Sequence, residues 1–479
     1  MPNRHSERGA ALIGAVLIIV ILSMLATVSL NVAAQEIESV TAAKEEAVAR
    51  HVAEAGADLV MQWFHDPSPD PGGPGRLLFA RRQTGADGSP SFFDDVGRSR
   101  FTGTEDRPDV LYDAARPPDN RLLNDPSTGW FRALGGLGRI TRLAVYAPAS
   151  PGLLCTVQVT AEARSLTRTL AVQMGATQLP PIRAGVQIGN SGPVQAAAGP
   201  LPVSVHWGAL IVNGDVRLGA LRDIPVKTDL APVTGQAYAD MEHREDRWFD
   251  VFVGGEALFT APPAGAEPVP PNLHVRQEPS PGLRQDRWDY QTLKETALRA
   301  GTYYARGQDG LLYRHGRIEP GRGVTATEAF QSGTVGDHHG LVFVDTLDQA
   351  PPHGDNLGTL VLNAGYMEGL FVVNAHVKFA PAGAGESLPA RSPETTEALQ
   401  LEGINLHGAL VTPGNLILDG SSRLYGAVIV GGTAEQASGT GAQLEVWYDN
   451  EFEAGLFRGL PLVHQALGTW LEKHGDKRT

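Results

Sequence analysis

The chain has 479 residues, enough for two or three domains, and a formal net charge of −14 at pH 7. Its acidity and its sparse basic clusters argue against a nucleic-acid groove or an anionic-lipid surface over most of its length, and its one cysteine, Cys155, excludes an intramolecular disulfide. With 56 glycines, 34 prolines and only 19% charged residues, the composition favours a turn-rich β protein over a helical enzyme.

The first predicted element is one long helix over residues 10–65. It follows a short charged leader, residues 1–9, and its first part, residues 10–34, carries no charge. That part is long enough to cross a hydrocarbon core of about 30 Å. Over residues 35–65 apolar side chains recur at helical spacing, until a proline-rich run ends the helix. The predicted membrane helix includes Ala10, Leu12, Ile19, Leu25 and Ala34.

The residues alone leave three interpretations of this N-terminal segment open. A secretory signal could be cleaved after Val32-Ala33-Ala34, although the apolar run is longer than the roughly 7–15 residues typical of such signals. A plain membrane anchor is the second interpretation. The third is a helix that is kept in the mature protein, and it is favoured because the helical pattern continues past Ala34 without a break.

Short motifs at both ends of this helix carry a family resemblance. Glu7-Arg8-Gly9 precedes Ala10-Ala11-Leu12, and Ala53-Glu54-Ala55-Gly56 lies farther along. This layout resembles a type IV prepilin, specifically the PilX-type minor pilins and more loosely the K-type pseudopilin of type II secretion. The resemblance implies that a prepilin peptidase cuts between Gly9 and Ala10 and that Ala10 is then methylated. Major pilins usually carry glutamate where this chain has Gly14, which argues against a major subunit.

After the helix, the sequence predicts an irregular linker and then a small sheet. Residues 66–135 are rich in proline, glycine and aspartate with weak hydrophobic periodicity, so we expect a loop-rich region that carries little core. Residues 136–178 contain three β-branched or alternating runs, and Arg164-Ser165 separates the last two at hairpin spacing. They predict a small antiparallel sheet, which is the pilin plan that the resemblance implies.

A degenerate repeat dominates residues 185–450. Residues 207–218 and 407–418 align without a gap, and each copy reads as a glycine, three or four apolar residues, a turn and further alternating apolar residues. Further copies occupy residues 369–379 and 426–432, with weaker copies at 340–345 and 358–363. Stacked short strands that share one core fit this repeat, so we predict a β-helix or β-solenoid, with a β-sandwich as the alternative. We expect a helical insertion at about residues 229–305.

The C-terminal region, residues 451–479, is predicted to be a helix and a tail that cap the solenoid. Apolar residues in 459–474 suit one face of a short amphipathic helix, and an open solenoid end needs a cover. The predicted fold class is therefore α+β and mostly β. It comprises a long N-terminal pilin-type helix, a small antiparallel sheet and a β-helix or solenoid-like domain with inserted helices.

The sequence predicts no catalytic, cofactor or metal site. Asp337-His338-His339 has metal-ligand residue types but no further ligand at suitable spacing, so we interpret it as a loop. Asp215, Asp345 and Asp419 occupy comparable turns of the repeat, where they could form a catalytic pair or bind Ca²⁺. Acidic side chains at turns more often bond to the backbone, and we expect that role here.

These observations predict a non-enzymatic minor pilin or pseudopilin-like subunit of a type IV pilus or a related secretion machine. It would be cut after Gly9, reside in the inner membrane with a periplasmic ectodomain, and then join the pilus at the cell surface. Its partners would be other pilin subunits, the prepilin peptidase and a possible surface ligand, but no nucleic acid. The alternatives are an anchored or secreted β-helical carbohydrate-binding adhesin or polysaccharide-active enzyme, and a self-associating envelope solenoid.

Overall fold

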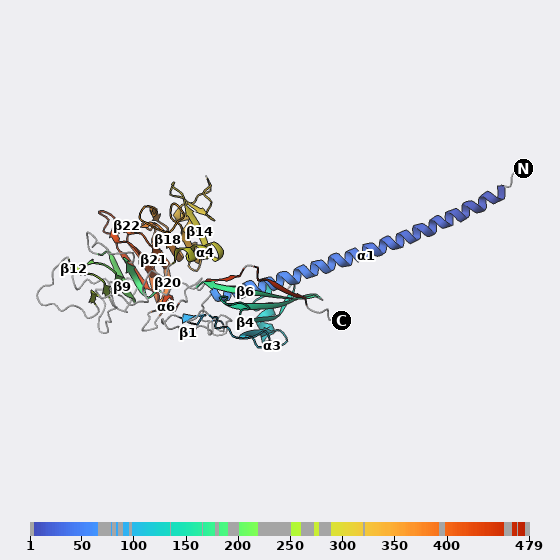
Figure 1. The fold of residues 1–479 in the computed structure, drawn as a ribbon, viewed down its shortest axis with the longest axis horizontal. Helices are drawn as coiled ribbons and strands as arrows, with labels where there is room; N and C mark the ends of the chain where they lie inside the picture. The colour runs from blue at the N-terminus through green and yellow to red at the C-terminus, as the bar shows by residue number, and fades with distance from the viewer. Residues whose placement is uncertain are drawn as a thin grey trace.

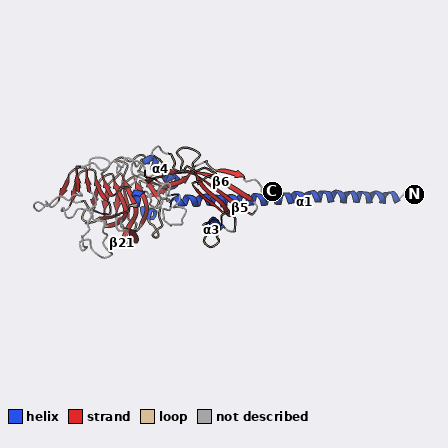
Figure 2. Ribbon diagram, turned by 90° about the horizontal axis from the view of Figure 1, so that it is seen from below, coloured by secondary structure: helices blue, strands red, loops and turns tan. Residues whose placement is uncertain are grey.

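A computed structural model gives the fold of this chain, which is α+β and mostly β (Figure 1). One long helix, a small antiparallel sheet and a larger solenoid-like region follow one another along the long axis (Figure 2). The structure describes residues 4–65, 78, 83–84, 90–94, 98–134, 136–164, 166–177, 182–189, 201–218, 251–259, 273–276, 289–319, 321–391, 398–454, 462–466 and 468–474.

The helix α1 runs without interruption over Arg4–His65, which is 62 residues. It confirms the predicted helix of residues 10–65 and adds part of the leader at its start. Strong helix formers dominate its second half, and the chain reaches Pro67 two residues after the helix ends. At about 1.5 Å per residue this helix is on the order of 90 Å long.

The small sheet has six strands and packs against the second half of α1. Its strand order is β26-β6-β5-β4-β3, and β27 also pairs with β6. All of its pairings are antiparallel, with β5 and β6 joined by the hairpin that the sequence predicts. The bounds are β3 (Val110–Asp113), β4 (Arg139–Tyr146), β5 (Cys155–Ala163), β6 (Leu166–Thr177), β26 (Leu462–Gln465) and β27 (Leu471–His474).

The region of residues 66–135 contributes more to this unit than the sequence predicts. It supplies β3, the helix α3 (Pro117–Asn124), the 3-10 helix η1 (Arg132–Leu134) and the short paired strands β1 (Gln83–Thr84) and β2 (Pro90–Ser91). The expectation of little core is wrong, because large buried side chains from this region fill the space beside α1. They are Leu78, Phe92, Phe101, Tyr112, Leu123 and Phe131. These residues have no regular spacing, so periodicity does not reveal them.

The predicted C-terminal capping helix is also wrong. Within residues 459–474 the described regular elements are the strands β26 and β27, and the described helix nearby is the single turn α6 (Glu451–Ala454). Both strands pair with β6, Leu462 opposite Thr177 and Leu471 opposite Ala171. An amphipathic segment this short can serve as a helix or a strand, and the open edge of β6 decides between them.

The solenoid-like region consists of parallel strands stacked in two sheets. Each repeat gives one strand to a large sheet and the next strand to a shorter one. In the large sheet these strands are β16 (Leu341–Val344), β18 (Met367–Val373), β21 (Ala398–Thr412) and β23 (Ser422–Val430). In the shorter sheet they are β17 (Thr359–Leu362), β19 (His376–Phe379), β22 (Leu416–Leu418) and β24 (Ala434–Gln436).

The register of the large sheet confirms the alignment of the main repeats. Gly369 lies opposite Gly408, and Gly408 lies opposite Gly426. Gly408 has φ 139°, and a Cβ on it would collide with the carbonyl oxygen of Gly369, so only glycine fits there. The weak copy at 358–363 differs from the others, because it forms β17 and lies in the shorter sheet.

The chain enters and leaves the solenoid in the middle of its stack. The strand β23 is flanked along its first half by β25 (Leu444–Tyr448) and along its last part by β7 (Ala184–Ile188). From β7 the stack continues through β9 (Ala209–Val212) and β11 (Val251–Val253) to β13 (Leu273–Val275). Separately, β8 (Val203–His206) pairs with β25. The opposite end is the hairpin of β14 (Thr302–Arg306) and β15 (Leu312–Arg314).

The predicted helical insertion at about 229–305 is only partly helical. The helix α4 (Tyr290–Ala300) lies in it, whereas β11, β13 and β12 (Ala257–Phe259) extend the stack, β12 by pairing with β10 (Val216–Leu218). Residues 229–250 lie outside the described residues. Apolar side chains fill the space between the two sheets, and a second cluster covers the outer face of the large sheet beneath α4, α6 and β20 (Glu386–Arg391).

Candidate functional site on the N-terminal helix

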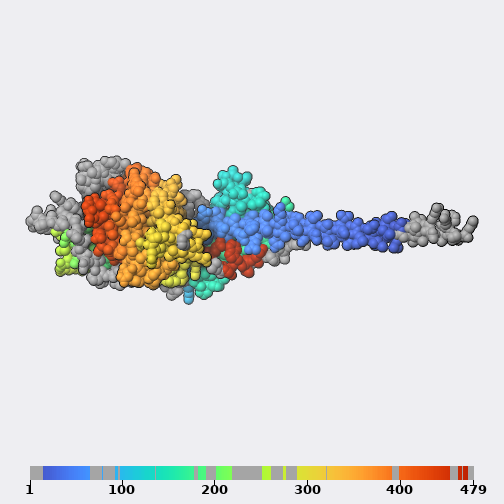
Figure 3. Space-filling model, turned by 90° about the horizontal axis from the view of Figure 1, so that it is seen from above, coloured from blue at the N-terminus to red at the C-terminus, as the bar shows by residue number. Residues whose placement is uncertain are grey.

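The described residues in the first half of α1 project from the rest of the chain as a bare rod (Figure 3). Every side chain over residues 15–44 is exposed, with Ile19 at 61% and Leu25 at 57%. The most apolar stretch has a mean hydropathy of 2.5 and none of it is buried, so it is long and apolar enough to cross a membrane. Burying one large aliphatic side chain is worth about 1.5–3 kcal/mol, so this surface favours a lipid or protein cover.

The residues predicted from the sequence lie along this rod and do not converge on a pocket. Gly9 and Ala10 lie within the backbone of α1, and like Leu12 they belong to the stretch whose side chains are outside the description. Ala34 is exposed, as are Ile19 and Leu25. Cleavage and methylation at Gly9 and Ala10 stay predictions.

The second half of α1 packs on the small sheet through apolar contacts, and this contact surface is called the seat of the helix. Val52, Ala53, Val60 and Phe64 are fully or almost fully buried in one cluster with the inward residues of β4, β5 and β6. Gly56 marks a close approach of α1 to β5, because a Cβ built on it would lie 2.6 Å from Cγ1 of Val159. The motif that carries the family resemblance thus contains the glycine that lets the helix approach the sheet.

Polar contacts flank this seat. At its start Arg164 Nη1, in the β5–β6 turn, lies 2.9 Å from Glu45 Oε1, and Arg168 Nη2 lies 2.7 Å from Glu46 Oε1. Farther along, Gln465 Nε2 of β26 donates to Asp58 Oδ1 at 2.8 Å. The helix is therefore tied both to the β5–β6 hairpin and to the C-terminal strands.

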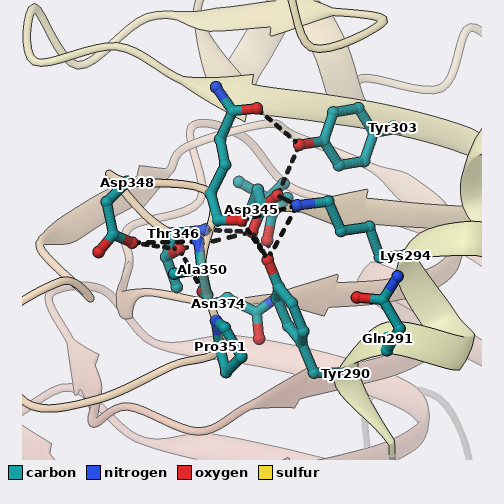
Figure 4. Close-up of polar contacts among 12 residues, drawn as sticks. Tyr290, Gln291, Lys294, Tyr303, Asp345, Thr346, Asp348, Ala350, Pro351 and Asn374 are labelled. Atoms are coloured by element: carbon teal, nitrogen blue, oxygen red, sulfur yellow. Dashed lines mark hydrogen bonds and ion pairs between the residues drawn. The ribbon is translucent and has the colours of Figure 1, made fainter.

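The turn residue Asp345 has a structural role (Figure 4). Its carboxylate is completely buried, lies 2.7 Å from Lys294 Nζ of α4, and accepts hydrogen bonds from the hydroxyls of Tyr290 at 2.7 Å and Tyr303 at 2.5 Å. Burial, together with these bonds to Asp345, raises the pKa of both tyrosines, so neither is activated as a base. Since no substrate reaches a carboxylate with no exposed surface, this cluster anchors α4 to the solenoid.

The other acidic turn residues are also engaged within the chain. Asp419 Oδ2 lies 2.8 Å from Lys378 Nζ, and Asp215 Oδ1 accepts the Glu256 N–H at 2.8 Å. Asp337 Oδ2 accepts the Gly333 N–H at 3.0 Å. Within the part of the chain that the structure describes, no group of three or more histidine, cysteine, aspartate or glutamate side chains is placed to hold a metal ion.

A row of polar and aromatic side chains on the outer face of the large sheet was not predicted from the sequence. The strand registers place them side by side on five neighbouring strands: Glu368, His407, Tyr425, Trp447 and His206. The His407 ring stacks on Tyr425 with centroids 5.1 Å apart, and His206 stacks on Trp447 at 3.6 Å. A signal was present, because three of these residues directly precede the aligned glycines of the repeat.

Comparison with known proteins adds one structural likeness. No family model and no curated protein sequence matches the chain. The crystal structure of the competence-associated pilin ComZ from Thermus thermophilus is similar over 71% of this chain and 84% of that chain, with a TM-score of 0.31 and 11% sequence identity. A TM-score this low does not establish a common fold, so the functional proposal stands on the residues of the chain itself.

Proposed function

We propose that this protein is a minor pilin or pseudopilin-like subunit of a type IV pilus or a related secretion machine. The observation that carries the proposal is the division of α1 into two halves. Its first half is apolar and uncovered, and its second half is seated on an antiparallel sheet that displays the rest of the chain. Such a helix can anchor the subunit in the inner membrane and later pack against the helices of other pilin subunits.

In this proposal a prepilin peptidase cuts between Gly9 and Ala10, and the new N-terminus is methylated. The charged leader contains Arg4 and Arg8, and positive charge favours the cytoplasmic side of a membrane. The small sheet and the solenoid then lie in the periplasm until the subunit joins the pilus. PilX-type membership rests on the sequence resemblance.

The shape of the chain supports a rare position at the end of a filament. The solenoid lies beyond the C-terminal end of α1 along the long axis of the molecule (Figures 2 and 3). In a filament of parallel helices the next subunit along the axis would need that space. Gly14, where major pilins usually carry glutamate, fits the same role. At such an end the solenoid is free to prime assembly or to contact a surface ligand.

The experiment that tests the proposal is intact-mass and N-terminal analysis of the full chain expressed with and without a prepilin peptidase. We expect a chain that begins at methylated Ala10 only when the peptidase is present. The variant Gly9→Trp should stay uncut, while the matched glycine variant Gly14→Ala should be processed normally. Cleavage after Ala34, or normal processing of Gly9→Trp, would contradict the proposal.

A polysaccharide-active enzyme is less well supported than this role. Asp215, Asp345 and Asp419, the acids that the repeat brings to comparable turns, bond to backbone or to lysine within the chain. Glycoside hydrolysis requires one carboxylic acid and one carboxylate that both face the substrate. These three aspartates do not provide such a pair. We therefore propose a role in assembly and contact, with no catalytic step.

A further inference from the structure

A lysine and an aspartate meet in a dry site where α4 packs on the large sheet. The Lys294 Nζ atom lies 2.7 Å from Asp345 Oδ2, and the two side chains are 18% and 0% exposed. Aromatic rings flank the pair, since Nζ lies 5.3 Å from the ring centroid of Tyr290 and 5.6 Å from that of Tyr303. An amine and a carboxyl group are therefore held together where water solvates them poorly, and separate charges are costly in such a site.

The Tyr290 hydroxyl bridges the two groups (Figure 4). It accepts a hydrogen bond from Lys294 Nζ at 3.0 Å and donates one to Asp345 Oδ1 at 2.7 Å. A path of hydrogen bonds therefore leads from the amine nitrogen to one carboxyl oxygen. Tyr303 donates to the other oxygen, Oδ2, at 2.5 Å. Burial, together with the bonds to Asp345, raises the pKa of both tyrosines, so their hydroxyls stay protonated as donors.

We propose that Lys294 and Asp345 condense to a side-chain amide, which links α4 covalently to the turn after β16. A proton first passes from the ammonium through the Tyr290 hydroxyl to Oδ1, which gives an amine and a carboxylic acid. The Nζ atom then attacks Cγ, and the hydrogen bond from Tyr303 stabilises the negative charge that develops on Oδ2. A second proton follows the same path, the Cγ–Oδ1 bond breaks, and Oδ1 leaves as water.

This step balances with the two side chains alone. The ammonium nitrogen gives two of its hydrogens to Oδ1 and keeps one as the amide N–H, and the net charge is zero before and after. The fold favours the step because it holds amine and carboxyl in contact, and because the neutral amide replaces two charges in a poorly solvated site. The water formed can leave along Lys294, which keeps some exposed surface.

A second lysine and aspartate in the solenoid provide an internal comparison. Lys378 Nζ lies 2.8 Å from Asp419 Oδ2, but these side chains are 36% and 32% exposed. Water solvates both charges there, so the ion pair is favoured over a neutral amine and acid. We expect this pair to stay unlinked although its distance is nearly the same. Burial and the tyrosine hydroxyls, and not proximity alone, distinguish the site at Asp345.

The amide would fasten one end of the solenoid. It joins the two ends of the segment that contains α4, the β14–β15 hairpin and β16, the strand with which β14 pairs. A cross-link of this kind restricts the unfolded chain more than the folded one. The β14–β15 end of the stack would therefore resist unfolding by heat or by tension along the chain.

The test is mass spectrometry of the full chain, purified in detergent and digested with trypsin. We expect residues 288–299 and 323–378 to appear as one branched peptide, lighter than the two together by the mass of one water molecule. Trypsin should fail to cut after Lys294. Separate unlinked peptides would overturn the proposal, and so would a loss of water located at another residue.

Variants assign the bond to these side chains. Lys294→Arg keeps the positive charge but removes the amine, so it should restore the full mass. Lys378→Arg, the matched substitution in the exposed pair, should leave the branched peptide unchanged. Loss of water that persists in Lys294→Arg would contradict the proposal.

If Lys294→Arg does not fold, Tyr290→Phe keeps both reacting groups and removes the bridging hydroxyl. It should form the amide about 100-fold more slowly, a typical contribution of general acid–base catalysis. The linked fraction of freshly purified protein, followed over time, measures this rate, and linkage as fast as in the unaltered chain would contradict the proposed proton path. This inference is independent of the proposed pilin role, since it concerns only α4 and the solenoid.

Discussion

The two halves of α1 share one continuous backbone and have opposite surroundings. The side chains of residues 15–44 are all exposed, whereas Val52, Val60 and Phe64 are buried against the small sheet. The second half of the helix, the seated half, therefore contributes to the folding of the head, which is the small sheet together with the solenoid. The first half, the bare half, contributes an apolar surface that some other molecule must cover. Substitutions in the two halves should separate stability from membrane behaviour.

The largest expected effect comes from the end of the seated half. Phe64 is completely buried, with edge-on contacts to Phe92 at 5.7 Å and Phe101 at 6.0 Å. Phe64→Ala should lower the free energy of unfolding by about 3–5 kcal/mol, because it removes a large side chain and leaves a cavity. Thermal unfolding of the full chain in detergent measures this. Ile19→Ala, in the bare half, should leave the unfolding of the head unchanged, and an equal loss from both would erase the distinction.

The next largest effect is expected on membrane insertion, from a substitution in the bare half of α1. Leu25→Arg puts a charge near the middle of the predicted membrane segment, at a cost of about 2.5–3.5 kcal/mol for insertion. We expect loss of protein from carbonate-washed membranes with an unchanged melting temperature of the head. Leu25→Met is the apolar control and should stay in the membrane fraction. Full membrane retention of Leu25→Arg would show that this segment is not the anchor.

The contact between the helix and the sheet at Gly56 provides a sharper test of the seat. Gly56→Val would push a side chain into Val159, and overpacking of this kind costs about 1–3 kcal/mol. Denaturant unfolding should show a lower midpoint, partly offset by the better helix propensity of the new residue. Ala34→Val, which enlarges an exposed side chain in the bare half, should not lower the midpoint. A stabilised Gly56→Val would mean that the helix can move away from β5 without penalty.

The smallest effect is expected at the edge of the seat. Arg164 is 77% exposed, and its ion pair with Glu45 is open to solvent and salt. Arg164→Ala should change stability by no more than about 0.5 kcal/mol. Chemical denaturation at low and high salt measures this change, and a larger loss would show that the Arg164–Glu45 ion pair, and not the apolar contact with the sheet, fixes the helix.

Periodicity and repetition allowed much of the fold to be predicted. The helix of residues 10–65 was readable because a long uncharged run passes directly into an amphipathic one. The parallel register of Gly369, Gly408 and Gly426 was readable because each copy of the repeat carries its glycine at the same place. The roles of Gly9 and Ala10 stay predictions, since processing is an event between this chain and an enzyme.

The parts that sequence reasoning missed depend on partners far away in the chain. The segments Leu462–Gln465 and Leu471–His474 became strands because β6, almost 300 residues earlier, offered two stretches of open edge. Lys294 and Asp345, and likewise His407 and Asp449, meet only because the stack brings separate strands and helices together. The sequence by itself determined the helix, its two halves and the repeat, because these follow from local spacing. The tertiary structure decided the closing strands and the buried charge clusters, because hydrogen-bond edges and desolvated charges are satisfied only by long-range contacts.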